Sequence, residues 1–323
     1  MQAVCYIQRL GIQSFNSVTR GGLTWLECAA FRRLPWIVHA FSTRHGGVSR
    51  TPAKGLNLGF TGWDERPRVE RNRQIFFEQL HVPDFALASL RQIHSSHTYK
   101  VMRDAAGRPD FLPGGFALVE PSNERMPVGD GLMTQEVGIL LPVKVADCLP
   151  VLLVDPRRRA VCALHSGWRG ALARIIEKGV GEMRRIFGSA PHELQVALGP
   201  SIRACCYRVG EEVVEAFEGR FRHAEKFFRR CASPSEGIAE HYPVLFLSSY
   251  PPGHEPSTTP AAHLDLVAVA EDQLRTAGVD PRHIYVSEFC TACRTDLFFS
   301  YRKEGARTGR LMGVIGIRPE GTH

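Results

Sequence analysis

Short apolar runs separated by Gly- and Pro-containing turns recur along most of this chain. Runs of this length that are rich in β-branched residues predict strands. We expect strands at residues 35–42, 138–145, 151–154, 160–164, 194–198, 284–286, 297–301 and 311–317. Apolar residues spaced three and four apart predict helices at 67–80, 167–187, 210–217 and 266–277. Strands mixed with helices in this way predict an α+β fold, in which a mixed β-sheet is flanked by helices.

The length of 323 residues agrees with a single domain, for which we expect residues 34–318 to form the body. Residues 1–33 are interpreted as a short N-terminal leader before the first strand. Two segments rich in Gly, Pro and charge, 103–127 and 219–262, are typical of surface insertions. No apolar run approaches the ~18 residues that cross a bilayer, and the N-terminus shows no secretory pattern. We therefore expect a cytoplasmic protein with no membrane partner.

The formal net charge of +7 raises nucleic acid as a partner. The basic residues are scattered, however, and the short runs at 157–159 and 229–230 are not interleaved with aromatic residues. We therefore expect no nucleic-acid partner, whereas a basic pocket for phosphate or a nucleotide agrees with the same charge. Nine irregularly spaced cysteines are interpreted as thiols or metal ligands, because an odd number in a cytosolic chain does not indicate a disulfide framework.

Metal-ligating side chains coincide with a hairpin pattern in residues 145–165. Two apolar strands flank a polar turn near 156–157, so Cys148 and His165 are expected to face each other, with Cβ atoms roughly 5 Å apart. A register slip of one residue would turn one of these side chains to the other face. The alternative interpretation is that both are ordinary buried core residues.

A third metal ligand has to come from another segment. Residues 89–94 alternate like a strand, which would place His94 on one face with Gln92 and Leu90. His97 is the rival for the same role. Three ligands of the His, Cys and His type leave a fourth position for water or substrate, as in catalytic zinc sites.

Ser166 follows His165 directly and is expected to cap the helix that begins there. A capped helix start with free N–H groups beside a metal would be a natural anion site. The alternative is a helix cap without any binding role.

With these residues in hand, the chain resembles the YfiH/YlmD family, which is also called the multicopper polyphenol oxidase laccase-domain family. The resemblance runs from about residue 38 to 317. Its motifs are HAFSTRHGGVS at 39–49, QIH at 92–94, GDGLMT at 129–134, ADCLP at 146–150, HSGWRG at 165–170, LGPSI at 198–202, CCY at 205–207, LDL at 264–266, CT at 290–291, FSYR at 299–302 and TGR at 308–310.

The resemblance implies a YfiH-type catalytic domain whose zinc ligands fall on His94, Cys148 and His165, which are then also the catalytic residues. It further implies phosphorolysis of the purine nucleosides adenosine, inosine and methylthioadenosine, and hydrolytic deamination of adenosine. The expected partners are therefore small molecules, namely purine nucleosides and phosphate. Nothing in the sequence indicates the oligomeric state.

Further roles follow from the chemistry that such reactions require. Asp147, next to Cys148, is a candidate for moving a proton, with a supporting carboxylate as the alternative. Guanidinium groups match phosphate bidentately. Gln92 carries an amide in the QIH motif, two residues before the predicted ligand His94. The candidates for binding substrate or phosphate are therefore Arg44, Gln92, Arg169, Arg302 and Arg310.

Three other functions stay open. Copper-dependent polyphenol oxidation, with Cu²⁺ in place of Zn²⁺, is suggested by the family's older name, but no His-x-His pair occurs among the 13 histidines. A metal-free hydrolase with Cys148 as nucleophile and His165 as base could edit cell-wall precursors. A protein that only binds a partner is the third, although no dedicated surface for one is visible.

Overall fold

The computed structural model describes residues 14–50, 52–115, 126–231 and 261–320. Contacts along the chain divide it into two compact units. The main unit comprises Met1–Ile202 with Leu266–His323, and the small unit comprises Arg203–Asp265. His94, Cys148 and His165, the predicted metal ligands, all belong to the main unit.

One six-stranded sheet of the main unit brings the two ends of the described chain together. Its order is β1 (Phe15–Arg20), β2 (Leu23–Cys28), β3 (Ile37–Ser42), β16 (Leu311–Ile317), β8 (Ile139–Val145) and β4 (Ala86–Leu87). All neighbours are antiparallel except β4 and β8, which are parallel. The sheet is therefore mixed, as the pattern predicted.

A seven-stranded sheet contains the predicted hairpin at its centre. Its order is β15 (Ile284–Val286), β11 (Gln195–Leu198), β9 (Leu149–Asp155), β10 (Ala160–Ser166), β7 (Gly131–Thr134), β5 (Thr98–Arg103) and β6 (Pro109–Pro113). Two of its pairs, β15 with β11 and β7 with β5, are parallel, and the other pairs are antiparallel.

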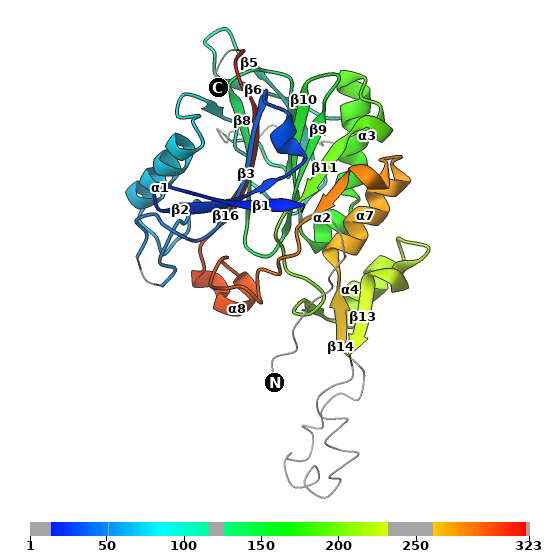
Figure 1. Ribbon diagram of the computed structural model, residues 1–323. Coiled ribbons are helices and arrows are strands. Elements are labelled where there is room, and N and C mark those ends of the chain that lie inside the picture. The colour runs from blue at the N-terminus through cyan, green and yellow to red at the C-terminus, as the bar shows by residue number, and fades with distance from the viewer. Residues whose placement is uncertain (1–13, 51, 116–125, 232–260, 321–323) are drawn as a thin grey trace, which may run out of the picture. The chain divides into compact units, whose positions relative to one another are not determined.

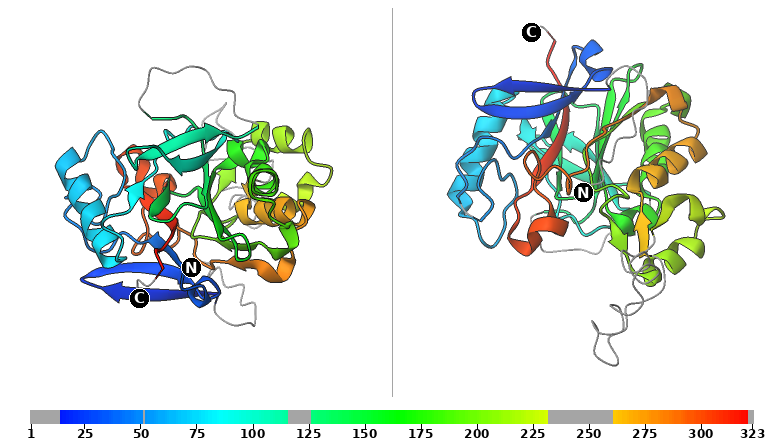
Figure 2. Two further views of the ribbon diagram at one scale, coloured as in Figure 1. Left: turned by 90° about the horizontal axis from the view of Figure 1, so that it is seen from above. Right: turned by 60° about the horizontal axis from the view of Figure 1, so that its bottom comes forward.

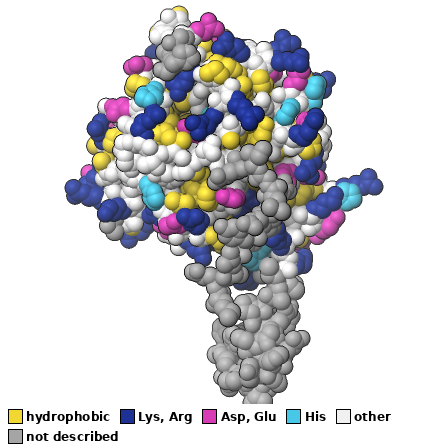
Figure 3. Space-filling model, viewed as in Figure 1, with side chains coloured by type: hydrophobic (Ala, Val, Ile, Leu, Met, Phe, Trp, Pro, Cys, Tyr) yellow, Lys and Arg dark blue, Asp and Glu magenta, His cyan; other side chains and the backbone are white. Residues whose placement is uncertain are grey.

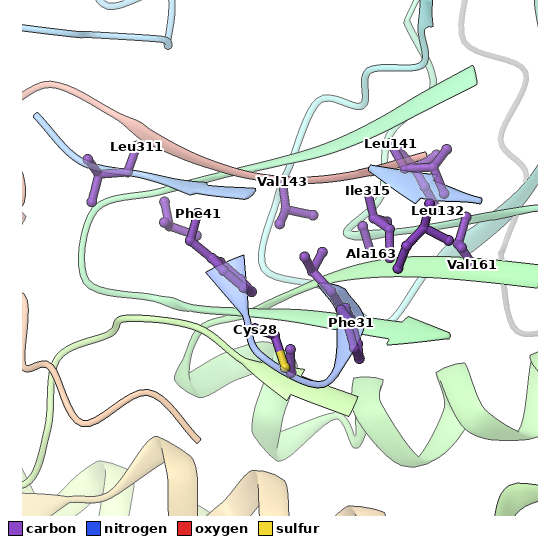
Figure 4. Close-up of a cluster of buried hydrophobic side chains, with 14 of the residues drawn as sticks. Cys28, Phe31, Phe41, Leu132, Leu141, Val143, Val161, Ala163, Leu311 and Ile315 are labelled. Atoms are coloured by element: carbon purple, nitrogen blue, oxygen red, sulfur yellow. The ribbon is translucent and has the colours of Figure 1, made fainter. Parts of the chain in front are cut away.

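The two sheets pack face to face, and the main core fills the space between them. Strands β8 and β16 of the first sheet contact β9 and β10 of the second. Phe41, Val143 and Leu311 from one sheet and Leu132 and Val161 from the other lie in one buried cluster (Figure 4). A core built from two facing sheets explains why so many of the predicted strands are almost entirely apolar.

Helices cover the outer faces of both sheets. Helix α1 (Arg66–Gln79) buries Phe76 against the six-stranded sheet, while α3 (Ile175–Phe187) contacts β10 and α7 (Leu266–Thr276). In Figures 1 and 2, α1 lies on one side of the sheets, and α3 and α7 lie on the other. The predicted α+β class, with mixed sheets flanked by helices, is therefore confirmed, although the strands are shared between two sheets. Because β9 and β10 are covered on both faces, all their residues are buried.

The predicted helix 167–187 is interrupted. It consists of α2 (Trp168–Leu172) and α3, separated at Arg174, which has a φ of 60°. A non-glycine residue in the left-handed region cannot continue a right-handed helix. The apolar periodicity persists across the break, so it could not reveal the interruption.

Two further expectations from the sequence are wrong. Residues 15–28 are not a leader, because β1 and β2 pair with each other and β2 pairs with β3. The apolar residues 297–301 form no strand. Phe298 and Phe299 are buried in loop conformation, and helix α8 (Tyr301–Glu304) follows. Burial of a loop produces the same local apolar pattern as a strand.

The small unit holds part of one predicted insertion. It contains β12 (Arg208–Val209), α4 (Glu211–Glu218), β13 (Phe228–Cys231) and β14 (Ala261–Leu264), and its three strands form a sheet in the order β12-β14-β13. In its interior the ring of Phe217 stacks on that of Phe221 and meets that of Phe227 edge-on. Most of the predicted insertion 219–262 lies outside the described residues. Within the other, 103–127, β6 pairs with β5.

The described surface carries scattered charge. On the face shown in Figure 3, Lys and Arg side chains lie among other residue types and do not form one continuous patch. Among the described helices, none combines the length and the apolar character that crossing a membrane requires.

The stability of the main unit is expected to depend on His39, which is 5% exposed in β3. Burial lowers the pKa of this imidazole to about 3. The unfolded chain, in which a histidine has a pKa of about 6.5, therefore binds more protons in acid, and stability is lost as pH falls below that value. From pH 7 to pH 5 this group should cost about 2 kcal/mol.

Denaturant unfolding at the two pH values measures this loss. The matched variant is His39→Gln, whose amide oxygen can replace Nε2 as acceptor for the Cys28 N–H, at 2.9 Å in the structure. The variant should lose less stability than the wild type between pH 7 and pH 5. Equal losses in both proteins would show that His39 does not titrate on unfolding.

Candidate metal centre

His165 occupies the end of β10 and is 3% exposed. Its Nδ1 lies 2.8 Å from Oδ1 of Asp130, a carboxylate that is itself 1% exposed. Nδ1–H donates a hydrogen bond to this carboxylate, so Nε2 is the ring nitrogen that remains for a metal ion. A carboxylate behind an imidazole is the usual support of a metal-bound histidine.

Asp130 also shapes the segment that carries His94. Oδ1 accepts the His94 N–H at 3.0 Å, and Oδ2 accepts the N–H and the hydroxyl of Ser95 at 2.6 and 2.7 Å. Although burial opposes ionisation, the bonds from His165 and Ser95 hold the pKa of Asp130 below its usual value. One buried carboxylate therefore positions two of the predicted ligands.

His94 does not lie on a strand, contrary to the expectation from the alternating residues 89–94. The described structure there is a loop with one isolated bridge, between Arg91 and Val128. His94 has a φ of 62°, which is uncommon for a residue with a side chain. The hydrogen bonds to Asp130 stabilise this conformation, so tertiary contacts place His94, and strand alternation does not.

Cys148 lies in the turn between β8 and β9, and the register of the hairpin differs from the predicted one. His165 pairs with Pro150, and Ser166 pairs with Leu149. Cys148 is therefore placed beyond the last pair rather than opposite His165. The preceding Asp147, with a φ of 87°, turns the chain so that the thiol still reaches the histidines.

The three predicted ligands come together. The donor atoms of His94, Cys148 and His165 all lie within 4.8 Å of one another, and Sγ of Cys148 is 3.7 Å from Nε2 of His94. His97 is not a member of this group. A set of two imidazoles and one thiolate suits zinc, and three protein ligands leave one position open.

Gly167 makes the close approach of these ligands possible. A Cβ atom at this position would lie 2.7 Å from Cδ2 of His94 and 2.9 Å from Sγ of Cys148. A side chain would therefore push the ligands apart. Gly167, and not Ser166, is the N-cap of α2, and the Ser166 hydroxyl makes no hydrogen bond among the described residues. The predicted serine cap is wrong.

The electrostatics favour an ionised thiol. Burial by itself would raise the pKa of Cys148, but the His165 and His94 imidazoles lower it below its usual value. Burial by itself would lower the pKa of the His165 imidazole, but the neighbouring Cys148 and Asp130 raise it to about 9. Since the thiolate is the form that ligates metal ions, the surroundings prepare Cys148 for this role.

Asp147 is tied to two other segments. Its Oδ1 accepts the Thr291 hydroxyl at 2.6 Å, and its Oδ2 accepts the Arg302 N–H at 2.7 Å. A carboxylate that is engaged on both oxygens is arranged to hold the turn before Cys148. This geometry favours the supporting role over proton transfer.

The amide of Gln92 is also used within the protein. Nε2 donates to the Lys144 carbonyl and Oε1 accepts the Lys144 N–H, both at 2.9 Å. The side chain thus extends the edge of β8 like a short strand. It thereby holds the loop that leads to His94, and both of its polar atoms are engaged by the Lys144 backbone.

The four predicted phosphate-binding arginines differ in their surroundings. Arg44 forms an ion pair with Glu304 at 2.8 Å, and Arg169 lies over the ring of Trp168 at 4.3 Å. Arg302 contributes its backbone N–H to Asp147. Arg310 is half-buried, and burial lowers its pKa, while the nearby Cys148, Tyr301 and Asp147 act in the opposite direction. Arg310 is thus the arginine with an electrostatic link to the Cys148 thiol.

Sequence reasoning missed Asp130 and Gly167 as parts of this site. Both stand in motifs that were recognised, GDGLMT and HSGWRG, but neither is a metal ligand. A signal for Asp130 was available, because metal-bound histidines usually have a carboxylate partner. A lone acid between two glycines before a strand was a candidate for that partner.

Comparisons with known proteins agree with this architecture. The family described as multi-copper polyphenol oxidoreductase laccase matches residues 38–318. Purine nucleoside phosphorylase YlmD of Geobacillus stearothermophilus is 34% identical over 311 residues, which cover 95% of this chain and 98% of that protein. Adenosine deaminase RL5, from an unknown prokaryotic organism, is 33% identical over 279 residues, or 86% of this chain and 93% of that protein.

Solved structures share the fold. The crystal structure of YfiH from Bacillus licheniformis has a TM-score of 0.75 and 26% identity, and that of YlmD from Geobacillus stearothermophilus has a TM-score of 0.73 and 31% identity. Each comparison covers 95% of this chain and 100% of the other. Since the family match spans most of the sequence and relatives above 30% identity align over nearly their full length, the chain belongs to the multi-copper polyphenol oxidoreductase laccase family.

Proposed function

We propose that this protein is a zinc-dependent enzyme of purine nucleosides. It would split adenosine, inosine and methylthioadenosine with phosphate, and it would deaminate adenosine with water. The convergence of His94, Cys148 and His165 carries the proposal, because this donor set with an open position is typical of catalytic zinc. The relatives named as purine nucleoside phosphorylases and as an adenosine deaminase support the substrate class.

The chain's own residues would prepare the site for the metal. When bound, zinc supplies a Lewis acid that polarises oxygen and lowers the pKa of water. His94, Cys148 and His165 would hold it, and Asp130 would keep His165 in the tautomer that presents Nε2. Gly167 would leave the space that the ligands need.

Phosphorolysis requires a cation for the attacking phosphate. A phosphate oxygen forms a bond to C1′ of the ribose while the N-glycosidic bond breaks, and the base departs with a proton. Among the predicted arginines we assign the phosphate contact to Arg310. It is half-buried, and it lies close enough to Cys148 for the charge of the thiolate to act on its pKa. Its guanidinium matches phosphate geometry. Arg44 is paired with Glu304 and would help to position the substrate. Arg169 and Arg302 remain further candidates for binding phosphate or substrate.

Deamination requires water at C6 of adenine and a proton for the departing ammonia. Because both carboxylate oxygens of Asp147 accept hydrogen bonds from Thr291 and Arg302, we assign Asp147 to holding the turn before Cys148. The proton donor would then be another group or a water molecule.

The proposal is tested by measuring bound metal and then incubating the protein with adenosine, with and without phosphate. Chromatography should show inosine as the product without phosphate, and adenine and hypoxanthine in addition with phosphate, because the inosine formed is itself split by phosphate. Removing the metal with a chelator should stop both reactions, and adding zinc should restore them. Nucleoside turnover that persists in metal-free protein would contradict a zinc mechanism.

The closeness of the Cys148 thiol to the imidazoles of His94 and His165 also favours a second candidate, a Cys/His hydrolase. The same experiment separates the two, because hydrolysis that needs Cys148 and survives metal removal would support the second candidate. The His/Cys/His group would hold one ion, whereas multicopper oxidation requires several copper ions. Copper chemistry is thus less well supported.

A further inference from the structure

A concave region of the main unit lies at the loop that follows β3. We call residues 44–50 together with 54–55 the glycine loop. It surrounds an open cavity of about 520 Å³. Gly46, Gly47, Arg44, Arg50, Lys54 and Asp296 line this cavity. The metal ligands His94, Cys148 and His165 are not among its lining residues.

The backbone of the glycine loop is held in a conformation that needs glycine. Gly46 and Gly47 have φ angles of 81° and 74°. A Cβ atom at Gly46 would lie 2.3 Å from Cδ2 of Leu23, and one at Gly47 would lie 2.7 Å from Cα of Leu56. Contacts on both sides hold the loop in place, since the N–H of the next residue, Val48, donates to Oδ1 of Asn72 at 2.7 Å.

Two consecutive backbone donors of this loop are unused. Among the described residues, the N–H groups of Gly46 and Gly47 have no hydrogen-bond acceptor. Their neighbours do, because the N–H of Arg44 donates to the Leu297 carbonyl and that of His45 donates to Thr43 Oγ1. Successive N–H groups in a turn with left-handed residues form a concavity that binds anions.

The charge around these donors is positive. Arg44, Arg50 and Lys54 contribute three cations to the lining, and neither Arg50 nor Lys54 has an ion-pair partner in the described part of the chain. The single carboxylate of the lining, Asp296, is neutralised by Arg294 at 2.7 Å. An anion in the cavity would thus meet two backbone donors and unpaired cations.

We propose that the glycine loop is a binding site for a phosphoryl group, held by the N–H groups of Gly46 and Gly47 and by the side chains of Arg50 and Lys54. The group is either inorganic phosphate, captured here before it reaches the Arg310 contact of the phosphorolysis, or the phosphate of a phosphorylated small molecule; the first case rests on the proposed function. Arg44 links the loop to the metal centre, because its partner Glu304 belongs to α8, whose Arg302 N–H binds Asp147.

The test compares the wild type with the double variant Arg50→Ala/Lys54→Ala. A matched control, Arg157→Ala/Arg282→Ala, removes the same charge from two exposed arginines that do not line the cavity. Binding of inorganic phosphate and of adenosine 5′-monophosphate is measured by calorimetry, and phosphorolysis and deamination of adenosine are measured in parallel. Charge-assisted contacts of this kind lead us to expect affinity about tenfold weaker in the first variant and unchanged in the control.

The arms distinguish the two sources. A KM for phosphate raised about tenfold, with an unchanged kcat and unchanged deamination, would identify inorganic phosphate as the ligand. Weaker binding of the nucleotide alone would identify a phosphorylated molecule. If the protein catalyses no phosphorolysis, the calorimetric comparison still decides the inference. Equal binding of both anions by the wild type and the first variant would overturn it.

Discussion

Replacing Cys148 with alanine is expected to abolish metal binding and, with it, both nucleoside reactions. The variant removes the sulfur that lies 3.7 Å from His94 Nε2 and leaves two imidazoles, which bind a divalent ion much more weakly. Since a catalytic metal supplies several kcal/mol of stabilisation, the rate should fall by roughly 10³-fold or more. Metal content by atomic absorption and initial rates with adenosine measure the two losses.

Cys162→Ala is the matched control for this variant. Cys162 lies in β10 like His165, but it is fully buried in the sheet and belongs to no group of candidate ligands. This variant should keep the metal and the activity. It should lose only some stability, because the substitution leaves a small cavity and removes packing contacts. A Cys148→Ala protein that is folded, metal-free and as active as the wild type would exclude the proposed chemistry.

Asp130→Asn is expected to weaken metal binding by about 10- to 100-fold without removing a ligand. The Asp130 carboxylate acts as an acceptor on both oxygens, on Oδ1 from His165 and His94 and on Oδ2 from Ile93 and Ser95. An asparagine side chain has only one oxygen, so its NH₂ group would replace either Oδ1 or Oδ2. The NH₂ group would then face N–H donors that it cannot accept. His165 and His94 would then lose their common support.

The decisive measurement is the response to added zinc. Because Asp130 acts through the ligands, turnover by Asp130→Asn should recover in part at saturating zinc, whereas Cys148→Ala should stay inactive. Asp155→Asn is the control, since Asp155 is also fully buried and accepts the N–H groups of Arg157 and Arg158 in another turn. It should leave zinc affinity unchanged. An Asp130→Asn protein with wild-type zinc affinity would rule out the positioning role.

Local sequence was sufficient for much of the framework. The apolar runs that became β3, β8, β9, β10, β11, β15 and β16 were predicted within a few residues, as were α1 and α7. Burial on both faces makes such strands continuously apolar, and this pattern is visible without any knowledge of the partner strands. The strands β1 and β2 were less predictable, because they are only partly buried and alternate weakly.

The hairpin around residue 157 shows where pattern recognition ends. The two strands were predicted correctly, but the register places Pro150, not Cys148, opposite His165. The strand register depends on the geometry of the turn and on the pairing of the whole sheet, and the spacing of apolar residues determines neither. The backbone at Asp147, with its φ of 87°, compensates for the difference.

The sequence by itself determined the fold class, because apolar periodicity is a property of short segments, and its ordered motifs determined, through the family resemblance, which three residues could hold a metal. Only the tertiary structure decided that Asp130 supports both histidines, that Gln92 and Asp147 are engaged within the protein, and that His94 sits in a left-handed turn. These facts depend on hydrogen bonds between segments tens of residues apart, and such bonds form only when the two sheets have packed and buried their polar groups together.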